Sequence, residues 1–60
     1  MKIKIIMDSG KEYVTERFDS IEDLSKSILY GPGAINYIST DEEEKILLNA
    51  EHISSIEILD

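Results

Sequence analysis

Residues 20–30, SIEDLSKSILY, decide the expected fold, because their apolar residues recur at helical spacing while the rest of the chain has the pattern of strands and turns. Ile21, Leu24 and Ile28 stand at i, i+3 and i+7, so a helix would carry them in one stripe. Leu29 extends that stripe by one position. The pattern predicts an amphipathic helix that lies on a sheet.

Both ends of this helix have recognisable signals. At its start, two cap registers are open: Ser20 with Asp23, or Asp19 with Glu22. At its end, Gly31 stands where a left-handed cap residue is wanted. The sequence therefore predicts a helix that runs to residue 30.

Gly31, Pro32 and Gly33 form a turn-rich tract directly after the predicted helix. Pro32 cannot continue a helix, so the tract predicts a tight connection to a strand. The functional alternative is a loop whose backbone lines a groove beside Tyr30 and Tyr37. A phosphate loop is excluded, because its glycines precede a helix and a Lys-Ser/Thr pair, whereas these precede a strand.

The N-terminal segment predicts a β-hairpin. Residues 2–7 alternate, with Ile3, Ile5 and Met7 on one face and Lys2 and Lys4 on the other, although Ile6 interrupts the pattern. Residues 8–11 (DSGK) supply turn chemistry, and residues 12–18 are expected to form a second strand. On that strand, Val14 and Phe18 are the expected core contacts.

The C-terminal half adds three more strands. We expect strands at residues 34–40, at 45 to 49 or 50, and from 54 or 55 to 59. The apolar phase slips at residues 50–53, which predicts a single helical turn or a bulge there. The expected fold is α+β in the order ββαβββ, a small antiparallel sheet or open barrel with one helix packed across it, in a single domain spanning residues 1–60.

Charge is distributed unevenly along the chain, whose formal net charge is −7. Residues 1–30 hold six acids and five bases, whereas residues 31–60 hold seven acids against Lys45 alone. Such an acidic surface repels phosphates, so the composition argues against direct nucleic-acid binding. The C-terminal half is the anionic half.

Further function classes are excluded by what the sequence lacks. Because there is no cysteine, disulfides, thiolate metal sites and a cysteine nucleophile are ruled out. The N-terminus has no signal-peptide core and no apolar run is long enough for a membrane span, so we expect a cytoplasmic protein without membrane partners.

Catalysis and metal binding are also disfavoured. His52 is the single histidine, and its neighbour in sequence is Glu51 rather than a nucleophile. The many carboxylates fall on expected turns and helix surface, where burial cannot raise a pKa for acid catalysis. We therefore expect no enzyme, no metal and no cofactor.

An interaction surface is the favoured hypothesis. It combines Tyr30 and Tyr37 with four consecutive carboxylates at an expected hairpin tip, which are Asp41, Glu42, Glu43 and Glu44. Tyrosine is enriched at binding surfaces, because it offers a large area at low conformational cost. The simpler interpretation is that the tyrosines border the core and the acids form a solvated loop that protects a sheet edge.

Residues 45–58, KILLNAEHISSIEI, resemble the "strand, Asn-x-x-His/Asp-Ile-x-x-Ile-Glu" ending of short proteins from Gram-positive bacteria and their phages, and of small flagellar FlbD-like proteins. The opening hairpin followed by FDSIEDL, residues 18–24, also looks like those phage open reading frames. The resemblance covers about a quarter of the chain at its C-terminal end. It implies a small β-rich accessory protein and assigns no catalytic residue.

Two hypotheses for function follow. The first is a non-enzymatic, acidic binding protein, of the type of a phage inhibitor or adaptor, whose anionic C-terminal half binds a basic protein surface. The alternative is a self-assembling homo-oligomer that binds a small ligand or peptide at the subunit junction.

Overall fold

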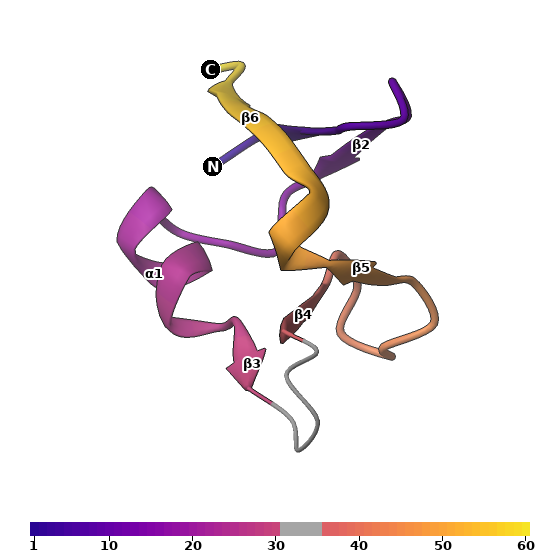
Figure 1. Ribbon diagram of the computed structural model, residues 1–60. Helices are drawn as coiled ribbons and strands as arrows, with labels where there is room; N and C mark the ends of the chain where they lie inside the picture. The colour runs from indigo at the N-terminus through magenta and orange to yellow at the C-terminus, as the bar shows by residue number, and fades with distance from the viewer. Residues whose placement is uncertain (31–35) are drawn as a thin grey trace.

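The computed structural model describes residues 1–30 and 36–60, so the expected loop at Gly31, Pro32 and Gly33 lies outside the described residues. Within these residues the chain forms six strands, one α-helix and one 3₁₀ helix (Figure 1). Their bounds are β1 (Ile3–Met7), β2 (Glu12–Thr15), α1 (Ile21–Lys26), β3 (Leu29–Tyr30), β4 (Asn36–Ser39), β5 (Leu47–Asn49), η1 (Ala50–His52) and β6 (Ile53–Ile58).

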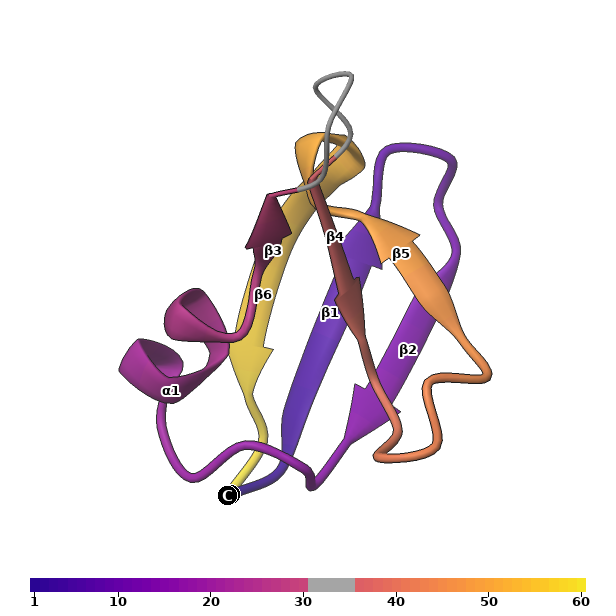
Figure 2. The same ribbon diagram turned by 90° about the horizontal axis from the view of Figure 1, so that it is seen from below.

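The strands form two antiparallel sheets that face each other. One sheet has the order β2-β1-β6 and the other β3-β4-β5. Figure 2 shows the second sheet lying over the first, with α1 at the side of β3 and β6. The expected α+β class, mostly antiparallel sheet with one helix, is confirmed. The order differs from ββαβββ, because a short strand, β3, follows the helix.

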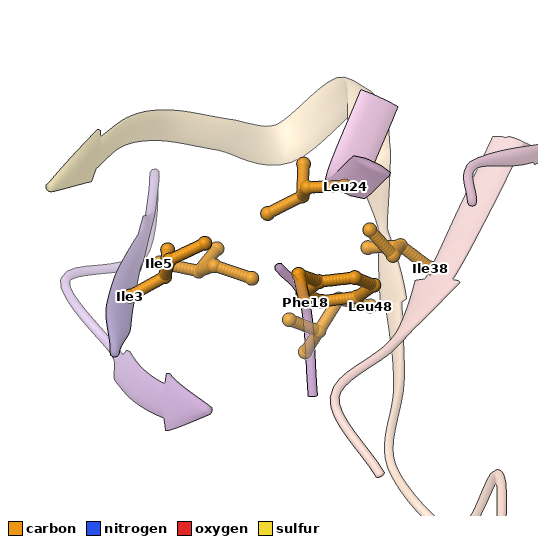
Figure 3. Close-up of a cluster of buried hydrophobic side chains, with 6 residues drawn as sticks. All are labelled: Ile3, Ile5, Phe18, Leu24, Ile38 and Leu48. Atoms are coloured by element: carbon orange, nitrogen blue, oxygen red, sulfur yellow. The ribbon is translucent and has the colours of Figure 1, made fainter. Parts of the chain in front are cut away.

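The core lies between the two sheets and the helix (Figure 3). Its six buried apolar residues come from both sheets, α1 and the connection before it: Ile3, Ile5, Phe18, Leu24, Ile38 and Leu48. Each is at most 5% exposed. Because these side chains are far apart in sequence, the core joins the two halves of the chain.

The helix is shorter than expected. Ser20 is its N-cap, and the Ser20 hydroxyl accepts a hydrogen bond from the Asp23 N–H at 3.0 Å, which confirms the first cap register. Its end is not at residue 30, since Ser27 is the C-cap and Leu29 pairs with Tyr37 in a strand. Sheet pairing thus overrides the helical periodicity of the last residues.

The second strand also presents a different face from the one expected. Tyr13 lies opposite Ile5 and Thr15 opposite Ile3, so Tyr13 and Thr15 share the core face. Val14 therefore points outward and is 52% exposed, and the prediction that it lies in the core is wrong. The strand ends at Thr15, which frees the chain to turn and bury Phe18 as predicted.

The expected irregularity at residues 50–53 is present. η1 forms a 3₁₀ turn whose cap is Asn49, and the Asn49 side chain accepts from the Glu51 N–H at 3.0 Å. Directly after it, the pairing of β6 with β1 shifts register between Ile6 and Met7. The turn and the register shift together absorb the change of apolar phase.

Candidate functional site

The acidic loop, residues 41–46, connects β4 to β5 and is organised around one carboxylate. Asp41 Oδ1 accepts from the N–H groups of Lys45 and Ile46, each at 3.1 Å. Asp41 Oδ2 also accepts from the Lys45 N–H at 3.1 Å, and the Ser39 hydroxyl donates to Oδ1 at 3.0 Å. Asp41 therefore folds the loop back on itself.

These hydrogen bonds lower the pKa of Asp41 from its ordinary value of 3.8. The largest cause is the hydrogen bond from the Ile46 N–H, followed by the one from Lys45. Both favour the charged carboxylate, and partial desolvation opposes them. Asp41 is thus ionised at neutral pH in its structural role.

The other three acids of the loop are exposed. Glu42, Glu43 and Glu44 have side chains in solvent, and the Glu43 carboxylate lies 2.7 Å from the Lys45 ammonium. Glu44 has a φ of 56°, a left-handed conformation that non-glycine residues adopt uncommonly. Of the four carboxylates expected at this surface, Asp41 is used internally and the glutamates face outward.

Two residues of the N-terminal half tether the loop to the opposite sheet. The Thr15 hydroxyl donates to the Thr40 carbonyl at 2.7 Å, and Arg17 Nη1 donates to the Ser39 carbonyl at 2.7 Å. Arg17 also stacks over Phe18, with 5.3 Å between the guanidinium carbon and the ring centroid. The start of the acidic loop is therefore held against the end of β2.

Tyr37 lies in the middle of the outer face of β3-β4-β5, the face opposite the core. It stands between Leu29 of β3 and Asn49 of β5, and Leu47 shares its face two residues from Asn49. Tyr37 is half-buried, whereas Leu29 is 45% and Leu47 56% exposed. This outer face places apolar side chains next to the acidic loop.

Tyr30, the other expected tyrosine, ends β3 and pairs through its backbone with Asn36. Its strand therefore borders that of Tyr37. Gly31, Pro32 and Gly33 lie outside the described residues.

A groove of about 320 Å³ lies in the seam, the opening between the edge strands β2 and β5. Met7, Tyr13 and Leu48 supply apolar lining, and Met7 and Tyr13 also pack against the core. At the end near the β1–β2 turn, His52 Nδ1 lies 3.5 Å from an Asp8 carboxylate oxygen. Both of these side chains are more than half exposed, so the pair borders the groove in contact with solvent.

The described residues, 1–30 and 36–60, show neither a metal-ligand cluster nor a membrane-spanning helix. They contain no group of three or more His, Asp or Glu side chains placed to hold a metal ion. No helix among them is long and apolar enough to cross a bilayer.

Sequence reasoning missed the contributions of Thr15, Arg17 and Tyr13. Thr15 and Tyr13 were expected on the outer face of their strand, and Arg17 carried no signal beyond its charge. The signal that could have placed Tyr13 and Thr15 was the hairpin register, since a turn at residues 8–10 sets them opposite Ile5 and Ile3.

Comparison of the chain with protein-family models, with curated proteins and with solved structures found no match. The FlbD-like ending therefore stays a resemblance of residues 45–58, which form β5, η1 and β6 together with the end of the acidic loop.

Proposed function

We propose that this chain is a non-enzymatic binding protein that uses the acidic loop and the outer face of β3-β4-β5 to bind a basic surface of a protein partner. The observation that supports this most is the internal fixation of the loop by Asp41, which leaves Glu42, Glu43 and Glu44 exposed on a defined backbone. A loop that is ordered before binding loses less conformational entropy on association.

The outer face supplies the apolar part of such an interface. Stable interfaces need desolvated apolar and aromatic area, and Leu29, Tyr37 and Leu47 offer it beside the loop. The glutamates would accelerate association with a cationic partner and orient it. Occupying a basic surface is how a phage-type inhibitor or an adaptor would act.

The test compares two variants with the same net charge. Glu42→Gln, Glu43→Gln and Glu44→Gln together remove the three exposed carboxylates of the loop, while Glu16→Gln, Glu22→Gln and Glu57→Gln remove three exposed carboxylates outside it. Each protein serves as bait for partner capture from a bacterial lysate. Captured proteins are identified by mass spectrometry, and the binding kinetics of the purified partner are measured at low and high salt.

We expect a basic partner that binds the wild type and the control variant but binds the loop variant at least about tenfold more weakly. We also expect its association rate to fall steeply with salt. Equal binding to the two variants, or association that is insensitive to salt, would refute this use of the acidic loop.

The alternative, a homo-oligomeric module, draws on the exposed strand edges of both sheets. The net charge of −7 opposes it, because two copies repel each other. Its test is the oligomeric state at neutral pH.

A further inference from the structure

The two facing sheets leave an opening at each side, and only one of these openings is covered by the helix. At the side of β3 and β6, α1 inserts Leu24, which is 1% exposed, into the core (Figures 2 and 3). At the opposite side, between β2 and β5, the seam holds the groove. Within residues 1–30 and 36–60, no helix or strand covers this seam.

The backbone of β2 is oriented to pair with another strand at this seam. The Met7 N–H donates to the Lys11 carbonyl, and alternate residues of an antiparallel strand bond to the same neighbour. Tyr13 and Thr15 therefore bond to β1. The N–H and C=O groups of Glu12 and Val14 point the other way, toward the seam.

The pairing of β1 with β6 independently supports this assignment of which residues bond to which neighbouring strand. The Leu59 N–H donates to the Lys2 carbonyl, so residues 2, 4 and 6 of β1 bond to β6. Residues 3, 5 and 7 are then left to bond to β2. The hydrogen bonds on both sides of β1 therefore agree that Glu12 and Val14 direct their backbone N–H and C=O groups toward the seam.

The groove is large enough for a few side chains of an added strand, but not for a whole helix or strand. Its volume of about 320 Å³ is near the lower end of ligand pockets, about 300–1,000 Å³. Every second side chain of a strand paired with β2 would point to the core face, over Met7 and Tyr13. Those positions favour apolar residues.

The charges around the seam favour a basic strand. Lys4 and Lys45 lie within ion-pair distance of Glu12 and Glu43, at 3.2 and 2.7 Å. Among the lining residues of the groove, Asp8 and Lys11 carry one charge of each sign. At the end of the seam where Thr15 contacts Thr40, the exposed Glu42 and Glu44 of the acidic loop outnumber Arg17. A second copy of this chain would bring its own net charge of −7, so a cationic segment of another protein fits better.

We propose that an extended segment of the partner, alternating apolar and basic residues, pairs with the free edge of β2 and closes the seam. This inference rests on the proposed function and specifies the part of the partner that is bound. Main-chain hydrogen bonds to Glu12 and Val14 supply affinity, and the groove selects the apolar side chains. The acidic loop at the end of the seam selects the basic ones.

The probes are three end-capped heptapeptides with the sequences KVKVKVK, EVEVEVE and KVKPKVK. Binding is followed by NMR amide shifts and by hydrogen exchange of the wild-type protein. We expect KVKVKVK to shift the amides of residues 11–14 and 47–49 and to slow exchange at Glu12 and Val14. The acidic peptide and the proline-interrupted peptide should bind at least about tenfold more weakly.

Variants at one position isolate the backbone contribution. Val14→Pro removes an N–H that points to the seam and costs no bond to β1, whereas the matched control Val14→Thr keeps that N–H. We expect Val14→Pro to weaken KVKVKVK binding about tenfold and Val14→Thr to leave it unchanged. If Val14→Pro does not fold, the exchange protection of the wild type decides the question.

Three outcomes would overturn the proposal: no binding of KVKVKVK, equal binding of EVEVEVE, or full binding by a folded Val14→Pro variant. The proposed function fails separately. If partner binding needs the glutamates of the acidic loop but tolerates Val14→Pro, the loop is the interface and the seam is not. If partner binding is lost in Val14→Pro but does not need the glutamates, the seam is the interface and the acidic loop is not.

Discussion

Asp41 shows how a residue that sequence reasoning placed on a surface can instead hold that surface in shape. Its carboxylate accepts hydrogen bonds from the backbone of Lys45 and Ile46, which close the acidic loop. An exposed cluster of four carboxylates would repel itself, and this use of one of them fixes the direction of the other three. The sequence shows that four acids stand together here. It does not show that Asp41 binds the loop backbone while the three glutamates face solvent.

The first prediction concerns the pH dependence of stability. Because hydrogen bonds lower the pKa of Asp41, its carboxylate stabilises the folded state at pH values above its ordinary pKa of 3.8. This contribution is lost as the pH falls through the lower, folded pKa. We expect Asp41→Asn to be less stable than wild type at pH 7 and to lose less stability on acidification.

Urea denaturation at a series of pH values between 7 and 2 measures both effects. Glu42→Gln is the control, since its exposed side chain sits beside Asp41 in the same loop. Parallel pH profiles for wild type and Asp41→Asn would show that the carboxylate has no such role.

The second prediction concerns the tether between the sheets. Thr15 is 6% exposed, and its hydroxyl donates to the Thr40 carbonyl at 2.7 Å and accepts from the Arg17 N–H at 3.1 Å. Thr15→Val keeps the shape but leaves these groups without their partner, at a cost of about 1–3 kcal/mol. The measurement is the free energy of unfolding, with Thr40→Val as the control because it retains its carbonyl. Equal losses in the two variants would contradict this role.

At the scale of elements, the helix illustrates what periodicity can and cannot predict. The start of α1 was predictable, since the Ser20 cap is a local interaction within four residues. Its end was not, because Leu29 pairs with Tyr37 and that pairing depends on where β4 lies. A stripe of apolar residues is equally compatible with a longer helix and with a helix followed by a short strand.

The third prediction tests which residue of α1 joins it to the core. Leu24→Ala should destabilise the protein by about 2–5 kcal/mol, because Leu24 is 1% exposed and its loss leaves a cavity. Ile21→Ala, on the same helix and 37% exposed, should cost less than about 1.5 kcal/mol. Urea midpoints give both values. If Ile21→Ala loses as much stability as Leu24→Ala, the whole apolar stripe expected from the sequence, and not Leu24 alone, anchors the helix.

At the scale of the whole molecule, local pairings were predictable and distant ones were not. The β1–β2 hairpin follows from a turn signal between two alternating segments. The return of β6 to β1 joins residues that are more than forty positions apart, and it places β6 in the sheet of β1 and β2 rather than beside β5. The groove and the Arg17 tether exist only because of these distant pairings, so the sequence carried no signal for them.

The last prediction concerns self-association, which distinguishes the two hypotheses for function. β2 and β6 are edge strands, with Val14 and Ile58 each 52% exposed, so the fold itself offers places for two copies to pair. At neutral pH the net charge of −7 opposes that pairing. Near the isoelectric point of about 4.4 the repulsion disappears.

Size-exclusion chromatography with light scattering should therefore give a monomer near pH 7 and larger species near the isoelectric point. Val14→Lys keeps a positive charge on the edge of β2 at both pH values and should suppress the association, whereas Ile21→Lys, which adds the same charge to the exposed side of α1, should suppress it less. A stable dimer near pH 7 would contradict the charge argument and favour the homo-oligomeric alternative. Equal suppression by the two lysine variants would show that net charge, and not the edge of β2, controls association.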